Sequence, residues 1–356
     1  MSTGTGLRAT QPTIEIAGQE NAELSGGLIG LLIEETNCGL YRCEALFGNW
    51  GARSGGAAFL YFDRRTLDFG KELKVRFGQT TAFEGRVMGL EANFPEDGRG
   101  TPEINVLAED RLQDLRMTRR TRSFENLSDA DLVRQIAGDH GLQTEVDLNG
   151  PTHLTLAQVN QSDLAFLRER VRAVDAELWV EGRTLNAKSR ASRTSDALQL
   201  TYKFNLREFT VLADLARQTT GVVVGGWDVA AKSALKYEAD EAAISNELGN
   251  TESGASILSS ALGARKESLS HLTPINSQET QAAAESWFRA CARRFVVGRG
   301  VAQTDRLLRA GGSVDLQGLG PLFNGKYYIS AVKHRFDRVM GLRTEFTVER
   351  PGIGRG

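Results

Sequence analysis

Residues 320–327, Gly-Pro-Leu-Phe-Asn-Gly-Lys-Tyr, have the glycine and lysine spacing of a loop that binds nucleotide phosphates. In such a loop a serine or threonine follows the lysine and holds the metal ion, but Tyr327 stands at that position. The loop also needs a following helix whose first amides point at phosphate, whereas residues 327–336 alternate as a strand does. The pattern therefore favours a hairpin turn, and we expect no cofactor.

A basic run in the first third of the chain is the second candidate, because arginines can neutralise nucleic-acid phosphates. Its members are Arg111, Arg116, Arg119, Arg120 and Arg122. Such a run more often forms a solvated linker or pairs with acidic neighbours. With 43 basic and 45 acidic residues, the net charge of -2 gives no general attraction to nucleic acid or to an anionic membrane.

Asp129 and Asp131 could be proposed as a carboxylate pair for glycoside cleavage, but glycosidases place their carboxylates across a cleft. Here both residues fall in the first turn of a predicted helix, where the helix dipole favours negative charge. Capping is the better explanation. The histidines lie far apart, without an HExxH motif or a cysteine at ligand spacing, so we expect no metal site; they are His140, His153, His271 and His334. The sequence also lacks the GxSxG motif of an esterase.

The elements that would position these residues are mainly strands. From residue 13 to about 110 apolar and polar residues alternate, as in residues 73–77 and 104–106, which predicts half-buried antiparallel strands. We assign residues 1–112 to a first β-barrel domain. The 38 glycines and 7 prolines agree with many short strands joined by tight turns.

The pattern changes to an α+β type in residues 113–190. Residues 127–131 predict a capped helix start, followed by apolar residues at helical spacing. A second helix is predicted from Ser162 and Asp163, and residues 178–185 predict a hairpin. We therefore expect a small α+β domain inserted into the β-structure.

Residues 191–356 return to strands and are assigned to a second β-barrel domain, with one helix near residues 277–294. Residues 231–276 are rich in Ser, Ala, Glu and Gly and are expected to form a mobile or partner-facing insertion. Trp227 and Asp228 end a predicted strand, and the tryptophan could pack in a core or at a subunit interface.

An internal repeat connects the two ends of the chain. Phe83-Glu84-Gly85-Arg86 reappears as Phe323-Asn324-Gly325-Lys326, each copy following a strand and preceding an aromatic residue, a glycine turn and an alternating strand. We infer two related β-barrels. Gly85 and Gly325 are then predicted to occupy equivalent turns, with a backbone geometry that a Cβ atom would strain.

Two further features concern location. The three cysteines, an odd number without metal-type spacing, indicate a reducing cytoplasm rather than a disulfide framework. The start of the chain lacks the pattern of a signal peptide, and residues 28–33 are too short an apolar stretch to cross a bilayer. We expect no membrane insertion by this chain alone.

Several short motifs, in their order along the chain, resemble the contractile tail hub family that includes phage late control protein D and the N-terminal hub part of VgrG-type proteins. These motifs are residues 83–87, 106–112, 121–124, 128–132, 141–142, 161–167, 224–228 and 323–328, with His334 and Phe336. The resemblance covers nearly the whole chain, from about residue 14 to residue 350.

This resemblance implies a non-enzymatic baseplate hub of a contractile phage tail or injection system. The implied assembly is a homotrimer whose two barrels per chain form a pseudo-hexameric ring, joining a hexameric tail tube to a trimeric spike. The other partners are baseplate proteins, and nucleic acid is expected only as passing cargo. The protein would assemble in the cytoplasm and then reside in the virion tail or tail-like particle.

The resemblance is incomplete at the C-terminus, because no spike-type domain follows residue 350, so the spike is expected to be a separate chain. Two alternatives remain from other classes: a tail-associated cell-wall hydrolase and a DNA-contacting tail protein. The type of particle, whether a phage, an extracellular injection system or a type VI device, stays open.

Overall fold

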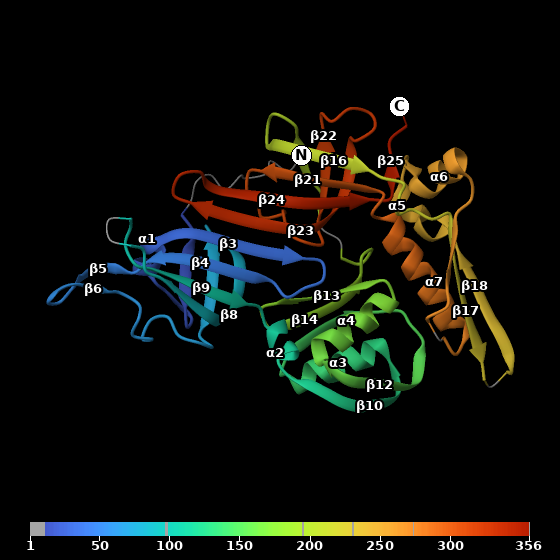
Figure 1. Ribbon diagram of the computed structural model, residues 1–356, viewed down its shortest axis with the longest axis horizontal. Coiled ribbons are helices and arrows are strands. Elements are labelled where there is room, and N and C mark those ends of the chain that lie inside the picture. Colours follow the sequence, from blue (N-terminus) through green and yellow to red (C-terminus); the bar gives the residue numbers. More distant parts are fainter. Residues whose placement is uncertain (1–10, 97–98, 194–195, 230, 273, 356) are drawn as a thin grey trace.

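A long, mainly antiparallel sheet runs through the protein, and two smaller units pack beside it (Figure 1). The computed structural model describes residues 11–96, 99–193, 196–229, 231–272 and 274–355. The fold is mainly β with an α+β unit between two sheet halves, as the sequence predicts. Within the described residues, no helix combines the length and the apolar character that crossing a bilayer requires.

The first half of the sheet is formed by the N-terminal third of the chain. Its strands alternate apolar residues toward the core with polar residues away from it, as in β4, which runs through Cys43, Ala45 and Phe47. The elements of this third are β1 (Thr13–Ile16), β2 (Gln19–Glu20), α1 (Ala22–Gly27), β3 (Leu28–Thr36), β4 (Arg42–Gly48), β5 (Trp50–Arg53), β6 (Gly56–Phe59), β7 (Glu72–Phe77), β8 (Thr80–Asn93) and β9 (Glu103–Glu109).

The second half has its own core, around Leu206, Val314, Ile329, Phe346 and Val348. Its elements are β15 (Leu198–Thr201), β16 (Leu206–Ala213), β21 (Val296–Ala302), β22 (Ser313–Gln317), β23 (Gly325–Asp337), β24 (Gly341–Arg350) and β25 (Gly352–Ile353). Figure 1 shows this half in red and yellow beside the blue first half.

The two halves repeat one strand order. In the first half the order is β3-β4-β9-β8-β7, and in the second it is β16-β21-β24-β23-β22. Both halves also carry a bulge where β8 meets β9 or β23 meets β24, just after Val87 and Ile329. A second shared bulge follows Leu28 in β3 and Leu206 in β16. Bulges fix strand register, so they give a residue-by-residue alignment of the halves.

Among the described residues, the strands of the two halves pair at one seam, where β23 runs antiparallel to β3. On the core side of this seam Glu35 of β3 is buried and forms an ion pair with Arg309, with 2.5 Å between Oε1 and Nε. The second oxygen of Glu35 accepts the backbone N–H of Ala310 at 3.1 Å. Because a charge buried without a partner is costly, this pair fixes how the halves meet.

The inserted α+β unit has two helices with the same start. Ser128 and Ser162 cap α3 and α4 by accepting the N–H of the residue three positions on. A core of leucine, isoleucine, valine and phenylalanine side chains lies beneath the helices. The elements are α2 (Leu112–Arg116), β10 (Arg119–Ser128), α3 (Asp129–Asp139), β11 (Gln143–Asp147), β12 (Thr152–Ser162), α4 (Asp163–Ala173), β13 (Ala176–Glu181) and β14 (Thr184–Ser189).

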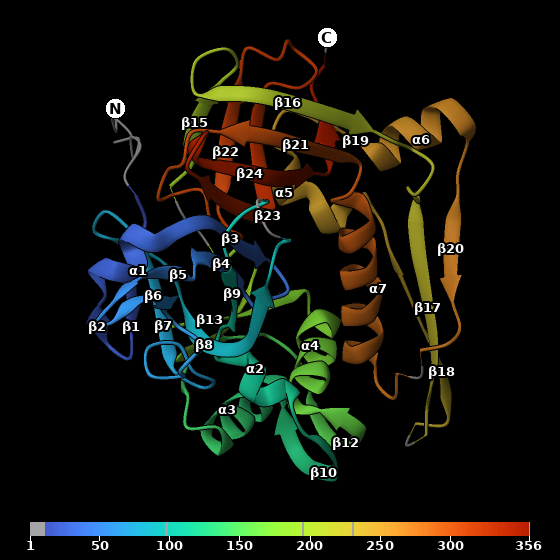
Figure 2. The ribbon, with the colours of Figure 1, turned by 60° about the vertical axis from the view of Figure 1, so that its left-hand side comes forward.

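A lateral unit interrupts the second half between β16 and β21. In Figure 2 its helix α7 stands between the inserted unit and the sheet of β17, β18 and β20. Residues 231–276, expected to form a mobile or partner-facing insertion, are built largely of regular elements, and β18 and β20 flank β17. The elements are β17 (Gly221–Asp228), β18 (Ser233–Ala239), the 3₁₀ helix η1 (Glu241–Ile244), α5 (Ser245–Leu248), β19 (Glu252–Ser253), α6 (Gly254–Leu262), β20 (Lys266–Leu269) and α7 (Ser277–Ala292).

The predicted boundary at residue 190 falls between the cores of the inserted unit and the second half, whereas Leu112, at the other predicted boundary, already packs in the core of the inserted unit. The division into three domains stays a prediction.

Candidate functional site

The face of the long sheet that points away from its cores is polar and carries charges of both signs. Lys333 of β23 pairs across the seam with Glu34 of β3 at 2.5 Å, and Arg335 pairs with Glu345 at 2.7 Å. In the second half this face is hollowed into an open cavity of about 540 Å³. Its lining includes Glu208, Thr210, Arg299, Lys333 and Glu345. We call this surface the polar face; its charged lining suits contact with water better than binding of an apolar ligand.

Within the described residues, strands β16 and β8 each have an open edge, as do the outermost strands β2 and β15. Among the described residues, β16 has no strand partner on the side away from β21. Strand β8 pairs with β7 only as far as Arg86, so within the described chain residues 89–93 have no partner on that side. Open edges present unpaired N–H and C=O groups, which are templates for another strand.

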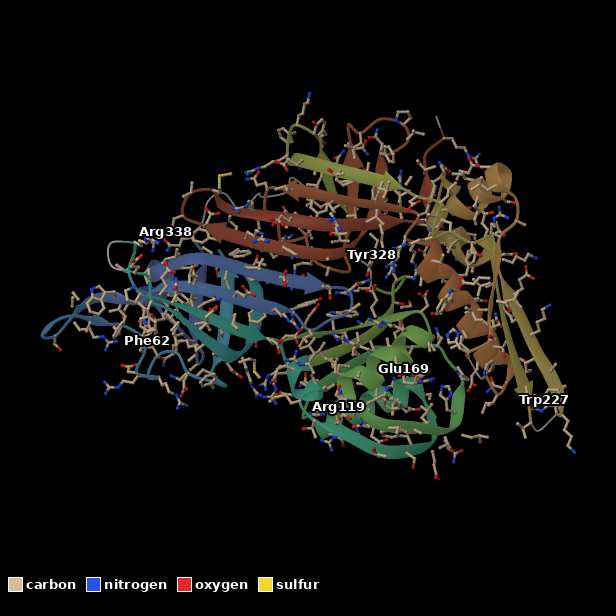
Figure 3. All side chains as sticks on the ribbon, in the orientation of Figure 1. Phe62, Arg119, Glu169, Trp227, Tyr328 and Arg338 are labelled. Carbon is tan, nitrogen blue, oxygen red and sulfur yellow. The ribbon has the colours of Figure 1, made fainter. Side chains whose placement is uncertain are left out.

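An exposed aromatic group lies beside the open edge of β8. Phe94 follows β8 and has 61% of its surface exposed, and its ring lies 5.4 Å from that of Phe62 and 6.1 Å from that of Phe59. Trp50 packs edge-on against Phe59 at 5.2 Å. Figure 3 shows Phe62 at the outer end of the first half, far from the inserted unit. Contiguous exposed aromatics of this kind mark interaction surfaces.

The inserted unit is bound to the second half by a buried polar cluster. Glu177 of β13 accepts hydrogen bonds from Arg193, at 3.0 Å, and from the hydroxyl of Tyr328. Arg190 lies over the ring of Tyr328, 3.7 Å from its centroid, and Arg193 lies over Trp179 at 3.9 Å. Figure 3 places Tyr328 between the second half and the inserted unit. Because both arginines come from the connection after β14, this connection acts as a structural joint.

The structure corrects the prediction for Gly85 and Gly325. Gly85 lies inside β8 opposite Leu73, not in a turn, and Gly325 begins β23 opposite Leu316. In the register set by the shared bulges, Gly85 corresponds to Tyr327, so the repeat read from sequence is displaced by two residues. A Cβ at Gly85 would meet the Phe83 ring and the Glu109 carbonyl, so close packing explains that glycine.

The equivalent glycines are instead Gly70 and Gly311. Both have a left-handed backbone, with φ of 76° and 89°. Gly70 donates its N–H to the carbonyl of Val87, and Gly311 donates to that of Ile329, the residues before the shared bulge. The repeated element therefore contains a left-handed glycine turn, which stands two residues before the start of β7 in the first half and of β22 in the second.

Phe83 and Phe323 play different parts. Phe83 is buried in the core of the first half, and Phe323 packs partly buried against the core of the second. The loop containing Phe323 binds Arg350, which donates to the carbonyl of Asn324 at 2.9 Å. Phe83 is buried and Phe323 is half-buried, and an interface role for either stays a proposal.

Trp227 lies at the far end of β17, as Figure 3 shows, with 54% of its surface exposed. It therefore does not belong to a core of this chain. Asp228 ends the strand and accepts the N–H of Ala231 at 2.9 Å, which is the bonding of a turn. An interface role for these two residues remains a proposal.

Replacing Trp227 by alanine is expected to change the free energy of unfolding by less than about 0.5 kcal/mol, because exposed side chains away from special features contribute little. Phe288 of α7 is fully buried in the same unit, and its replacement by alanine is expected to cost about 3–5 kcal/mol. Urea denaturation of both variants measures the contrast. A loss above about 2 kcal/mol for Trp227→Ala would contradict the exposed position.

The residues with possible chemistry are used structurally. Lys326 and Tyr327 lie in β23, so a strand follows the glycine loop where a phosphate site needs a helix. Asp129 is buried and accepts hydrogen bonds from Arg170 at 2.7 Å, and Asp131 is bonded to Ser128 and Arg134. Among the described residues there is no group of three or more His, Cys, Asp or Glu side chains that could hold a metal ion.

The arginines of the basic run pair mainly with acidic neighbours, which is one of the two structural explanations that the sequence allowed. Arg116 bonds with Glu109, and Arg122 reaches the buried Asp163 at 2.9 Å. Arg119 at the start of β10 donates to a backbone carbonyl, that of Asn160. These contacts favour a structural role over phosphate binding.

Sequence reasoning located neither the open edges nor the aromatic group. Trp50, Phe59 and Phe62 precede the predicted repeat and lie in short strands or loops. An aromatic concentration within residues 50–62 was a visible signal, but nothing local shows that Phe94 joins them. Edge strands are a property of sheet order, which local alternation does not encode.

Several solved structures share this fold. The 43 kDa tail protein of prophage MuSo2 from Shewanella oneidensis has a TM-score of 0.72 at 13% identity, covering 96% of this chain and 98% of its own. The tail protein from Neisseria meningitidis MC58 has a TM-score of 0.70 at 11% identity, covering 97% and 98%. The E. coli c3393 protein, described as a type VI secretion component similar to T4 tail proteins, has a TM-score of 0.61 at 12% identity, covering 96% and 79%.

A search of curated proteins gives no match. A family model described as the Alg8 N-terminal domain matches residues 57–338, which is most of the 356-residue chain and covers part of each sheet half. The chain therefore belongs to the Alg8 N-terminal domain family.

Proposed function

We propose that this chain is a structural hub of a contractile phage tail or a phage-tail-like injection system, of the late control protein D and VgrG-like type. Three copies would form a ring of six related sheet halves, matching a hexameric tail tube on one side and a trimeric spike on the other. The observation that carries this proposal is the repeated strand order with its shared bulges.

The repeat supports the proposal because a chain with two related halves can present similar surfaces at six positions in a trimer. A threefold assembly is then compatible with a sixfold partner without six identical chains. The likeness to tail proteins and to a type VI secretion component supports a place in such a particle.

The polar face supports the passage of cargo. In the ring it would line the channel, where alternating charges such as Lys333 and Glu34 keep the wall wetted. Apolar residues there would hold back hydrophilic cargo and reduce solubility. The tube, baseplate and separate spike proteins are the proposed partners, with nucleic acid only as passing cargo.

We also infer a non-enzymatic role. The candidate carboxylates support it, because Asp129 is fully engaged by Arg170 and His153, while the carboxylate of Asp131 accepts hydrogen bonds from Ser128 and Arg134. Burial opposes ionisation of Asp129, but hydrogen bonds from His153 and Arg170 outweigh it and lower the pKa of this carboxyl, which suits an ion pair rather than a general acid.

Native mass spectrometry of the purified protein, alone and co-expressed with its spike, tests the assembly. We expect a mass of three chains in at least one of the two samples, since closed symmetry stops further addition. A monomer in both samples, or a ring of six copies of this chain, would refute the proposed hub.

A further inference from the structure

We propose that the open edge of β8 in one copy pairs antiparallel with the open edge of β16 in the next copy, in a register set by the seam within the chain. This inference rests on the proposed ring and adds the contact that would build it. Its occupant is a second copy of this chain. Its basis is the internal repeat, which provides a template for the junction.

The template is the seam between β23 and β3. The shared bulges align β23 with β8, so that Ile329 corresponds to Val87, and align β3 with β16, so that Leu28 corresponds to Leu206. The seam therefore joins the counterpart of β8 to the counterpart of β16. Those two counterparts are the strands whose matching edges are open in the isolated chain.

The register follows by transferring each pair across the alignment. His334 faces Ile33 in the seam, and these correspond to Ala92 and Val211. The same transfer from the printed seam gives Leu90 opposite Ala213, Glu91 opposite Leu212, Asn93 opposite Thr210 and Phe94 opposite Phe209.

The side chains agree with this register. On the core side the pairs join apolar residues throughout, with Leu90, Ala92 and Phe94 meeting Ala213, Val211 and Phe209. On the polar face the junction contains Glu91, Asn93 and Thr210, together with the exposed Leu212. A shift by one residue would turn every apolar side chain to the wrong face, so the alternation selects the register.

In this arrangement the next copy covers the exposed aromatic group. Phe336, the counterpart of Phe94 in the seam, is partly buried and packs against the core of the adjoining half. Phe94 would pack likewise against the core beside Phe209 in the next copy. Trp50, Phe59 and Phe62 adjoin Phe94 and would be shielded from water with it.

One element of the seam is missing from the junction between copies. Glu35 corresponds to Ala213, and Arg309 corresponds to Asp68, which bonds with Arg64 at 2.6 Å. The buried ion pair is therefore replaced by an apolar contact. This contact between copies buries no charge. Its formation therefore desolvates no charged group, and its separation leaves no charged group without a partner.

Engineered cysteines test the register directly. Opposed residues of antiparallel strands have Cα atoms about 4.5–5.5 Å apart, which suits a disulfide. The double variant Glu91→Cys with Leu212→Cys changes two surface positions, and Leu212 is 62% exposed. Its matched control is Glu91→Cys with Glu208→Cys, because Glu208 lies four residues away on the same strand, about 13 Å off.

After mild oxidation, denaturing electrophoresis without reductant is expected to show two- and three-chain products, about tenfold more abundant than in the control. Mixing the separate Glu91→Cys and Leu212→Cys variants should give only the two-chain product, which keeps the test open if the double variant folds poorly. The single variants measure the background from Cys38 and Cys291, which are partly exposed.

The outcomes separate this inference from the proposed hub. A trimer in native mass spectrometry without cross-linking above the control overturns the register and leaves the ring standing. A monomer without cross-links overturns both. Equal cross-linking in the test and control pairs also overturns the register, because it would show nonspecific encounter.

Discussion

Replacing Arg293 by methionine is expected to lower the free energy of unfolding by about 3 kcal/mol. Arg293 ends α7 with 8% of its side chain exposed, and it binds Asp175 after α4 and Glu247 of α5. Burial alone would lower the pKa of this guanidinium, but hydrogen bonds from it to Glu247 and Asp175 raise it. Methionine would leave two carboxylates facing each other without a cation.

The expected loss of unfolding free energy is at the low end of the range for breaking a buried ion pair. The reason is that the side chains of Glu247 and Asp175 are partly exposed, at 30% and 16%. Chemical denaturation measures it. The neighbouring Arg294 is exposed, so Arg294→Met is the control and should change stability by less than about 0.5 kcal/mol. Adding Glu247→Gln to Arg293→Met should recover part of the loss; equal stability of Arg293→Met and wild type would contradict the ion-pair role.

Acidification is expected to destabilise the fold through His334, by about 3 kcal/mol between pH 6.5 and 4. His334 is 2% exposed in β23 and bonds with Thr344 at 2.9 Å. Burial lowers its pKa from 6.5 to about 4. The folded state therefore favours the neutral ring, and this contribution is complete above pH 6.5 and lost as the pH falls toward 4.

Comparing the pH dependence of wild type and His334→Gln isolates this contribution from the titration of carboxylates. Unfolding free energies measured from pH 7 to 4 should fall less steeply in the variant. His271→Gln, at an exposed position, serves as the control and should follow the wild type. Parallel curves for wild type and His334→Gln would show that the buried ring does not titrate as expected.

Local patterns in the sequence predicted the elements well where one face is buried. Ser128 and Ser162 predict the starts of α3 and α4, because a serine cap and the apolar stripe that follows it are local signals. Alternation likewise predicted strands such as β7 and β9. The mainly β fold with an inserted α+β unit follows from these elements.

Features that depend on long-range contacts were not predictable in this way. The sequence repeat aligned Gly85 with Gly325, whereas its structural counterpart is Tyr327. Bulges and loop lengths shift register without changing local composition. The buried stripe of α7 runs through Thr280, Ala284 and Phe288 and leaves Trp287 40% exposed, although helical spacing alone does not show which face is covered. The neighbouring sheet decides which helix face is covered.

The seam between β3 and β23 also constrains when the protein can finish folding. Its two strands, Leu28–Thr36 and Gly325–Asp337, lie near opposite ends of the chain. At translation rates of about 5–20 residues per second, β3 waits roughly 15–60 s on the ribosome before its partner is made. During that interval its edge is open to pairing with other nascent chains. Completion of the sheet is thus a late event in folding, with high contact order.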